Sequence, residues 1–265
     1  MTGTMWTGAE AYERLMGRWS RKLASLLMEF AGVQDGDRVL DVGCATGSLT
    51  RVLLQEMPHS EVVGVDPAAA FIEHARENMS DPRVRWESGD ARSLPLPDNA
   101  FDRCLSLLVM NFISDASKAT AEMARVTRPG GTVAAAVWDY GEGMEMLRIL
   151  WDTAVGLDPS AESSHERNSP YCSRGELGAL WADSGFQDVS ETALTIPLDF
   201  SSFEDYWTPF LAGVGPPGAY VTGLAAEARE ELRERVQDRL LGGRGDGSFS
   251  LQARAWAVCG TVPQQ

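Results

Sequence analysis

The sequence lacks two features of membrane and exported proteins. Its 265 residues contain no run of about 18 or more apolar residues, the length that a membrane-spanning helix needs. The first residues, MTGTMWTGAEAYERLMGRWSR, do not show the basic start and apolar stretch of a secretory signal. We therefore expect a cytoplasmic protein with no membrane partner.

Basic residues are also scarce. There are 23 Lys and Arg against 38 Asp and Glu, which gives a formal net charge of −15. A negative field repels phosphate backbones, so a nucleic-acid partner is not expected. The one local basic cluster lies near the N-terminus and has the spacing of one helix face: Arg14, Arg18, Arg21 and Lys22.

Cysteine pairs at metal-binding or redox spacing are absent. The four cysteines, Cys44, Cys104, Cys172 and Cys259, are far apart and form no C-x-x-C pattern. Zinc sites and redox-active pairs use such close spacing. The sequence therefore predicts no metal site, and the thiols are expected to pack as small apolar groups.

Strand and helix patterns alternate through the first half of the chain. Helical spacing covers residues 9–31 and short apolar strands are expected at 38–43, 61–66, 84–90, 101–109 and 132–138. Helices are expected between them, at 47–57, 68–79 and 118–126, and a turn at 129–131. This alternation with short links predicts an α/β fold with a doubly wound, Rossmann-like sheet.

The alternation stops after residue 138. A helical piece at 144–156 is followed by a polar stretch at 158–173, and Ser173 with Glu176 forms a capping box for a helix at 173–184. The remainder is expected as a strand at 188–196, two helical pieces within 202–241 separated at 213–218, a loop at 242–247 and a strand at 250–262. We predict a seven-stranded sheet whose last strand is antiparallel, with a helical cap over the carboxyl ends of the strands.

A glycine loop follows the first strand. In VLDVGCATGSLT, residues 39–50, Gly43 ends the apolar run and Gly47 begins the next helix, as in turns that bring the backbone close to a ligand. Asp66 ends the next strand, where a carboxylate can accept hydrogen bonds from both ribose hydroxyls. Together they favour a ligand that contains adenosine; the alternative for Asp66 is a helix cap.

Asp90 ends the third expected strand, in GDARSLPLPD. Its carboxylate and the Ala91 amide are candidates for the edge of an adenine ring. An Asx-turn is the alternative explanation.

Four motifs occur in a fixed order: VLDVGCATG, VVGVDPA, GDARSLPLPDNAFD and ARVTRPGGTV. In this order and spacing, over about residues 36–138, they resemble the class I S-adenosylmethionine-dependent methyltransferases, in the group related to ubiquinone and menaquinone methyltransferases. The resemblance implies S-adenosyl-L-methionine as cofactor and S-adenosyl-L-homocysteine as product. The chain departs from the family at Ala45, where glycine is usual, and we expect the extra methyl group to reduce the space between the loop and the methionine part of the cofactor.

The resemblance also implies a set of cofactor-binding residues. Those at the methionine end are Asp41, Gly43, Cys44 and Gly47. Asp66 and Pro67 would hold ribose and flank adenine, Asp90 and Ala91 would bind its edge, and Leu107 would cover the cofactor. The segment YERLMGRWS is similar to a lid in some of these enzymes, in which Tyr12 and Arg18 would close over the methionine carboxylate; alternatively Tyr12 and Trp19 are helix core.

These assignments predict a division of the chain. Residues 1–35 form a helical lid, 36–140 the cofactor-binding core, and 141–172 with 197–249 the cap. Residues 173–196 and 250–265 complete the sheet.

Catalytic residues are difficult to identify, because a sulfonium methyl is already electrophilic and needs chiefly in-line placement and exclusion of water. A general base is required only where the acceptor must lose a proton. The weak candidates are His165, Tyr140 and Asn111. His165 lies in the polar stretch and is otherwise a solvated loop residue, and Asn111 occupies a position at which relatives often carry histidine.

Aromatic residues gather at the expected acceptor site. Those assigned to a substrate pocket are Trp138, Tyr140, Trp151, Tyr171, Tyr206 and Trp207. Such a lining suits a small hydrophobic or aromatic acceptor, whereas the alternative is that about half of these rings form the core of the cap.

We therefore predict a methyltransferase that acts on an oxygen, nitrogen or carbon atom of a small molecule, as a monomer or homodimer. One alternative is a protein that binds S-adenosylmethionine for regulation or for sulfonium-assisted chemistry other than methyl transfer. An NAD(P)-dependent reductase is disfavoured because none of the five tyrosines has a lysine four residues later; the only lysines are Lys22 and Lys118.

Overall fold

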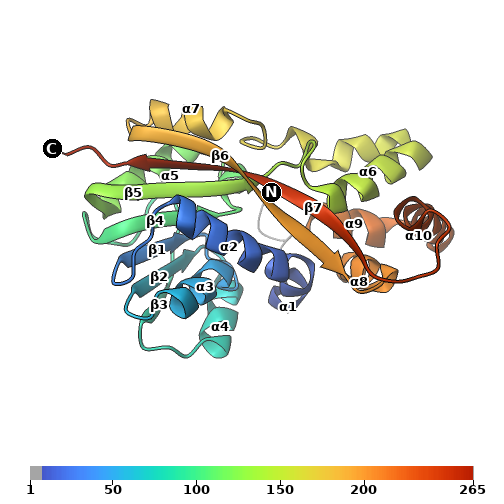
Figure 1. Cartoon of the computed structure of the whole chain (residues 1–265), viewed down its shortest axis with the longest axis horizontal. Coiled ribbons are helices and arrows are strands. Elements are labelled where there is room, and N and C mark those ends of the chain that lie inside the picture. The colour runs from blue at the N-terminus through green and yellow to red at the C-terminus, as the bar shows by residue number, and fades with distance from the viewer. Residues whose placement is uncertain (1–7, 265) are drawn as a thin grey trace.

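The computed structural model describes residues 8–264 and contains one seven-stranded sheet in the order β3-β2-β1-β4-β5-β7-β6. Figure 1 shows the sheet with helices on both of its faces. The strands are β1 Arg38–Val42, β2 Glu61–Asp66, β3 Val84–Ser88, β4 Phe101–Leu107, β5 Thr127–Trp138, β6 Gln187–Phe200 and β7 Phe249–Thr261. β1 to β5 pair in parallel and β7 runs antiparallel to both β5 and β6, so the predicted fold class is confirmed.

The parallel strands β1, β2 and β4 lie inside the sheet and are mostly buried, whereas β3 is an edge strand with one buried residue. β1 lies between β2 and β4, and all of its residues but the first are buried, which explains the apolar residues Val39, Leu40 and Val42. The chain adds strands on one side of β1 and then returns to add β4 on the other. Ligands of open α/β sheets bind at such a reversal, beyond the carboxyl ends of the strands.

Helices of the first half follow the predicted positions closely. They are α1 Ala9–Tyr12, a π-helical turn Glu13–Gly17, α2 Arg18–Phe30, α3 Ser48–Glu56, α4 Ala69–Asn78 and α5 Ala116–Val126. The helix expected at 9–31 is thus continuous but contains a π turn. π turns are rare and frequently occur at functional sites.

The turn expected at 129–131 lies inside β5 instead. Pairing of β4 with β5 shifts register between Phe101, which faces Thr127, and Arg103, which faces Thr132. Gly130 within this irregularity has φ of 74°. The glycines therefore form a bulge, because a bulge absorbs the extra residues without ending the strand.

The second half adds α7 and a cap. α7 Glu176–Asp183 packs on β6 and β7, and it begins later than its predicted start at residue 173. Gly175 precedes it in a left-handed conformation with φ of 89°. Of the predicted capping box, one bond is present: the Ser173 amide donates to Glu176 Oε2 at 3.3 Å.

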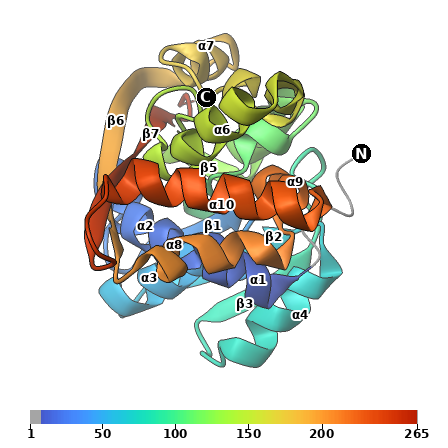
Figure 2. The ribbon, with the colours of Figure 1, turned by 90° about the vertical axis from the view of Figure 1, so that its right-hand side faces the viewer.

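The cap lies beyond the carboxyl ends of the parallel strands, at the end of the sheet that faces the viewer in Figure 2. Its elements are α6 Glu145–Leu157, the 3₁₀ turns Pro159–Ser164 and Glu166–Asn168, α8 Phe203–Trp207, the 3₁₀ turn Thr208–Ala212, α9 Gly215–Gly223 and α10 Ala226–Leu241. The polar stretch at 158–173 is thus partly 3₁₀-helical. The break expected at 213–218 is shorter, because α9 takes Pro216 and Pro217 into its first turn, where proline needs no amide partner.

The antiparallel pair β6 and β7 extends beyond β5, and the chain that connects β6 to β7 forms part of the cap. Pairing of β5 with β7 ends at Trp138 and Ala255, whereas β6 and β7 continue to Phe200 and Phe249. Phe200 contacts Tyr206 of α8 at 5.4 Å between ring centroids. No helix within residues 8–264 is long and apolar enough to cross a membrane.

Candidate functional site

The loop after β1 is held in a conformation that few side chains allow. Gly43, Ala45 and Gly47 have φ of 73°, 45° and 85°. A Cβ atom on Gly43 would lie 2.6 Å from Val109, and one on Gly47 would lie 2.7 Å from Trp86. Ala45 is a non-glycine residue at positive φ, a conformation that costs about 1–2 kcal/mol for an L-residue.

Asp66 ends β2 beside this loop and is 7% exposed. Its Oδ2 accepts a hydrogen bond from the Ala45 amide at 3.0 Å, and its Oδ1 accepts one from the Ala68 amide at 2.8 Å. Burial raises the pKa of Asp66. Each carboxylate oxygen can accept a second hydrogen bond, so Asp66 fits a pair of ligand hydroxyls.

The helix-cap alternative for Asp66 is not the arrangement seen. Its bond goes to Ala68, which is itself the N-cap residue of α4, and α4 has no side-chain cap among the described residues. Asp66 instead ties the glycine loop to the start of the segment before α4.

Asp41 lies in β1, beneath the loop, and is 1% exposed. Its Oδ2 accepts hydrogen bonds from the Thr50 amide at 3.2 Å and from Thr50 Oγ1 at 2.7 Å. Burial raises the pKa of Asp41 to about 7, and the charge of Asp66 contributes to the increase. Asp41, whose ionisation is disfavoured by burial, thus lies close to the glycine loop.

A small cavity adjoins the loop. Its lining residues are Tyr12, Ser20, Asp41, Gly43, Cys44, Ala45, Thr46, Ser48, Leu49 and Leu107. Five of the predicted cofactor residues are among them: Tyr12, Asp41, Gly43, Cys44 and Leu107. The sequence reasoning missed the hydroxyl groups of Ser20, Thr46 and Ser48, although the last two flank Gly47 and were visible as polar residues at a helix start.

Tyr12 lines the cavity and also packs against α4. It lines the cavity, and its ring lies 5.8 Å from that of Phe71 in α4. Burial raises the pKa of Tyr12 to about 12, although the neighbouring Ser20 hydroxyl lowers it. The phenol therefore stays protonated at neutral pH.

Glu13, in the π turn, was not predicted as a site residue. Its Oε1 accepts hydrogen bonds from Thr46 Oγ1 at 2.5 Å and from Ser48 Oγ at 3.4 Å, and its Oε2 pairs with Arg21 at 2.7 Å. Burial acts to raise the pKa of Glu13, but the bonds from Thr46 and Arg21 outweigh it and hold the pKa below its usual value. The π turn thus positions the ionised carboxylate of Glu13 against the residues at the start of α3.

Arg18 does not occupy its predicted place over a methionine carboxylate. Its Nη1 bonds both carboxylate oxygens of Asp205, at 3.0 and 3.1 Å, and its guanidinium lies 4.1 Å from the centre of the Trp19 ring. It is not among the described residues that line the cavity. Because Asp205 belongs to α8, Arg18 joins the N-terminal helix to the cap.

Asp90 lies at the surface beyond the end of β3. Arg92 pairs with it at 2.6 Å, and the Arg92 amide donates to its Oδ1 at 2.8 Å, as in the Asx-turn alternative. The Arg92 hydrogen bonds lower the pKa of Asp90 to about 2. Ala91 is partly exposed and Pro67 is exposed, so the adenine contacts of these residues stay a prediction.

The end of β4 borders the same edge. Leu108 has φ of 65°, and such strain is often found at functional sites. Asn111 follows in a short 3₁₀ turn and is 8% exposed. Neither polar atom of its amide has a hydrogen-bond partner among the described residues, so the amide is available to a ligand or a water molecule.

Some of the aromatic residues assigned to a substrate pocket belong to the packed core of the cap. The Tyr206 hydroxyl donates to the Met146 carbonyl at 2.8 Å, and Trp207 stacks with Phe203 at 6.1 Å. Both are at most 2% exposed. For these two rings the structure agrees with the cap-core alternative.

Of the other assigned aromatic residues, Trp138 and Tyr140 lie at the end of β5, whereas Trp151 is buried in the cap. Trp138 ends β5 and Tyr140 follows it; both are buried. Trp151 in α6 is buried and donates its indole N–H to Glu166 at 2.6 Å. Tyr171 is partly buried. His165 is half-buried and stacks on Trp151 at 5.5 Å.

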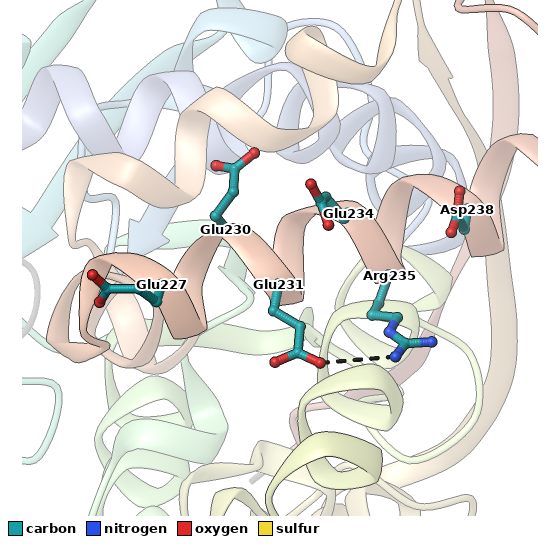
Figure 3. A pocket seen from close by; sticks show the side chains of 6 residues that line it. All are labelled: Glu227, Glu230, Glu231, Glu234, Arg235 and Asp238. Carbon is teal, nitrogen blue, oxygen red and sulfur yellow. Dashed lines mark ion pairs between the residues drawn. The ribbon is translucent and has the colours of Figure 1, made fainter.

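A second hollow lies on the outside of the cap, along α10. Figure 3 shows its lining, Glu227, Glu230, Glu231, Glu234, Arg235 and Asp238. Apart from the pair of Glu231 with Arg235 at 3.8 Å, these side chains spread along one face of the helix. This surface is a charged face of α10, and none of its lining residues belongs to the cavity beside the glycine loop.

Comparison with known proteins gives consistent matches. Residues 39–131 match the family described as "Methyltransferase domain". The chain is 31% identical over 154 residues to the malonyl-[acyl-carrier protein] O-methyltransferase of Serratia marcescens, covering 56% of this chain and 58% of that protein. It is 30% identical over 164 residues to the demethylmenaquinone methyltransferase of Roseiflexus castenholzii, covering 58% of this chain and 69% of the relative.

Among solved structures, phosphoethanolamine N-methyltransferase 2 of Haemonchus contortus, in complex with S-adenosyl-L-methionine, shares the fold. The TM-score is 0.60 at 19% identity, over 97% of this chain and 57% of that one. The chain spans less than two thirds of the Serratia relative's length. From the match to the Roseiflexus relative and from the family match and fold, the chain belongs to the class I S-adenosylmethionine-dependent methyltransferases.

Proposed function

We propose that this chain binds S-adenosyl-L-methionine at the loop after β1 and transfers its methyl group to a small hydrophobic or aromatic acceptor. The observation that carries the proposal is Asp66. It is a buried carboxylate at the reversal point of the sheet, fixed by two backbone amides, with acceptor capacity left on both oxygens.

Polar groups that line the cavity, and others at the same edge of the sheet, are suited to the parts of this cofactor. Asp66 would accept hydrogen bonds from the two ribose hydroxyls. The hydroxyls of Thr46 and Ser48, together with the phenol of Tyr12, would surround the zwitterionic methionine end. Asp90 and Ala91 would contact adenine, and Leu107 would cover the sulfonium side.

When bound, the cofactor supplies an electrophilic methyl group. The task of the chain is then to hold the acceptor in line with it and to exclude water. We propose that residues 8–35 close the cavity, and that the cap segments at 141–172 and 197–249 enclose the acceptor.

The acceptor class rests on the surroundings of the site and on the relatives. The relatives act on a malonyl-acyl-carrier protein and on demethylmenaquinone by name. In this chain the edge beside β5 is lined by Trp138 and Tyr140, and the net charge of −15 disfavours a nucleic acid. A small apolar acceptor with one reactive atom suits these surroundings.

Calorimetry with S-adenosylhomocysteine tests the proposal. We expect Asp66→Asn to weaken binding by about 10²-fold, because each hydrogen bond to a charged group contributes about 1.5–3 kcal/mol. The matched control is Asp81→Asn, an acid on the surface that pairs with Arg83 at 2.7 Å, and its affinity should equal that of the wild type. Absence of binding, or equal affinity of the Asp66 variant, would refute the cofactor site.

A second measurement separates the alternatives. Release of S-adenosylhomocysteine with any member of a panel of phenols, amines and carboxylic acids shows methyl transfer. Tight binding without such release would favour the regulatory alternative, and binding of NADPH in place of S-adenosylhomocysteine would favour a reductase.

A further inference from the structure

A carboxylate of the N-terminal helical segment is hydrogen-bonded to the wall of the cavity beside the glycine loop. Glu13 Oε1 accepts hydrogen bonds from Thr46 Oγ1 at 2.5 Å and from Ser48 Oγ at 3.4 Å. Thr46 and Ser48 line the cavity, whereas Glu13 is not among the described residues that do so. One hydroxyl group therefore separates Glu13 from a ligand that contacts this wall.

The π turn Glu13–Gly17 holds the carboxylate in one place. The Glu13 side chain folds over Gly17 so closely that a Cβ atom on Gly17 would collide with the carboxylate. The second oxygen, Oε2, accepts a hydrogen bond from Arg21 of α2 at 2.7 Å. Both oxygens are thus fixed, Oε1 toward the start of α3 and Oε2 toward Arg21.

The bond from Thr46 fixes the direction of a hydroxyl proton. Because the pKa of Glu13 lies below its usual value, the carboxylate is ionised at neutral pH and can only accept hydrogen bonds. Thr46 must then donate its one proton to Glu13. A hydroxyl group whose proton is used in this way offers only lone pairs to a further partner. Toward the cavity, Thr46 Oγ1 is thus an acceptor.

The backbone of the glycine loop has few amides left for an anion, although such loops often bind anions through their amides. Four amides donate within the protein: those of Gly43 and Cys44 to the Val65 carbonyl at 2.7 and 3.1 Å, that of Ala45 to Asp66 at 3.0 Å, and that of Gly47 to the Cys44 carbonyl at 2.8 Å. These amides are not available to a ligand carboxylate.

The cations near Glu13 leave this pattern in place. Arg21 pairs with it, and the charge of Arg51 in α3 also contributes to its lowered pKa. Both compensate the charge of Glu13, but neither is among the residues described as lining the cavity. The direction of the Thr46 proton does not depend on this compensation, because it follows from the carboxylate being an acceptor.

The cavity lining offers a ligand carboxylate no cationic partner. Among the described lining residues there is no Lys, Arg or His, whereas Asp41 is one of them. Arg18, which was predicted for this role, is held by the cap instead. The hydroxyls of Tyr12 and Ser20 remain as neutral donors. Such surroundings favour a cationic end group over an anionic one.

We propose that Glu13 determines which end of the methionine moiety this cavity holds: by taking the Thr46 proton, it makes the wall an acceptor for the α-ammonium group and a poor site for the carboxylate. This inference rests on the proposed function and extends it to the orientation of the amino-acid part of the cofactor. Since Glu13 acts through Thr46, it is a positioning residue.

Three ligands that differ only at this end test the inference by calorimetry. They are S-adenosylhomocysteine, its decarboxylated analogue, which keeps the ammonium group, and its deaminated analogue, which keeps the carboxylate. We expect the wild type to bind the decarboxylated analogue about 10²-fold more tightly than the deaminated one, because hydrogen bonds to charged groups are the strong ones.

The variant Glu13→Gln should reduce this preference to about tenfold or less. Arg21 can only donate, so the one oxygen of the glutamine should face Arg21 and its N–H group should face Thr46. Thr46 then accepts, and its proton is free to turn toward the cavity. The matched control is Glu10→Gln, an exposed acid of α1 that pairs with Arg14 at 3.3 Å, and its preference should equal that of the wild type.

Two substitutions of Thr46 test the same wall without changing Glu13. Thr46→Val keeps the shape but has no acceptor, so it should lower the affinity for the decarboxylated analogue by at least about tenfold and leave that for the deaminated analogue unchanged. Thr46→Ser keeps the hydroxyl and should keep the wild-type preference. A merely structural role of Glu13 would change the affinities for both analogues together and leave their ratio unchanged.

The outcomes separate this inference from the proposed function. If the wild type binds none of the three ligands, the proposed function itself fails. If it binds S-adenosylhomocysteine but does not prefer the decarboxylated analogue, or if Glu13→Gln keeps the wild-type ratio, the role of Glu13 is refuted while the cofactor site stands. If Glu13→Gln does not fold, the Thr46 pair decides: equal ratios in Thr46→Val and Thr46→Ser would overturn the inference.

Discussion

Replacing Asp41 with asparagine should stabilise the protein at neutral pH while weakening cofactor binding. Asp41 is 1% exposed, and both of its hydrogen bonds from Thr50 go to the same oxygen, Oδ2. An asparagine side chain has an oxygen that can accept both bonds. Asp41→Asn therefore removes the negative charge and keeps the local contacts.

The size of the effect follows from the pKa of Asp41. Burial raises it from 3.8 to about 7, so the folded state binds the proton more tightly than the unfolded state does. The contribution of this group to stability is complete below pH 3.8 and is lost as the pH rises through 7. At 1.36 kcal/mol for each pH unit, the loss is up to about 4 kcal/mol, a large part of the roughly 5–15 kcal/mol that stabilises a typical protein.

Urea unfolding at pH 5, 6, 7 and 8 measures this. The free energies of unfolding of the wild type and Asp41→Asn should diverge as the pH rises, with the variant more stable at pH 8. The control Asp81→Asn should run parallel to the wild type, because Arg83 lowers the pKa of Asp81 and the residue is already ionised across this range. If the free energies of unfolding of the wild type and Asp41→Asn change with pH in parallel, the reasoning is refuted. Weaker binding of S-adenosylhomocysteine by Asp41→Asn would show that the destabilising acid at this position serves cofactor binding.

Three further substitutions test the site. Ala45→Gly removes about 1–2 kcal/mol of strain from the left-handed backbone conformation, and it costs about 0.5–1 kcal/mol through the greater entropy of the unfolded chain. Thermal unfolding should therefore show equal or slightly higher stability, and calorimetry should show equal or tighter binding of S-adenosylhomocysteine. A marked loss of affinity would mean that the loop is misassigned. Arg18→Gln breaks a partly exposed pair and should lower the free energy of unfolding by about 1 kcal/mol without changing that affinity, and a tenfold weaker binding would restore Arg18 as a cofactor ligand. Gly17→Ala places a Cβ atom against the carboxylate of Glu13, so it should lower the free energy of unfolding by about 1–3 kcal/mol and weaken the binding of S-adenosylhomocysteine. If neither the stability nor the affinity changes, Glu13 does not support the glycine loop.

The sheet and its reversal point were predictable because they rest on local patterns. Short segments in which apolar residues predominate, as in Arg38–Val42 and Phe101–Leu107, indicate strands of a sheet that is covered on both faces. The helices between them follow from spacing and short links. Asp66 was identifiable for the same reason: it is the residue that ends the second strand.

Boundaries set by glycine and proline were less predictable. Gly130 forms a bulge inside β5 rather than a turn, and Gly175 delays the start of α7. Such residues permit several conformations, and the one adopted depends on which strand or helix packs beside them. The sequence pattern alone does not contain this information.

The partners of charged side chains were the least predictable part of the site. Arg18 was expected at the cofactor, but its partner Asp205 lies 187 residues away in the chain. The π turn brings Glu13 to Thr46, and helical spacing at 9–31 gave no indication of a π turn. Tyr206 was assigned to a pocket because aromatic residues suit both pockets and cores, and only packing distinguishes the two.

The sequence by itself determined the α/β class, the position of the glycine loop and the acid after the second strand, because hydrophobic periodicity and strand-end motifs are encoded within a few neighbouring residues. The tertiary structure decided which groups are buried and which charges are paired. The raised pKa of Asp41, the bond of Glu13 to the loop and the ion pair of Arg18 with Asp205 all depend on segments distant in the chain. Desolvation and pairing are properties of the packed molecule, so they become visible only once it has folded.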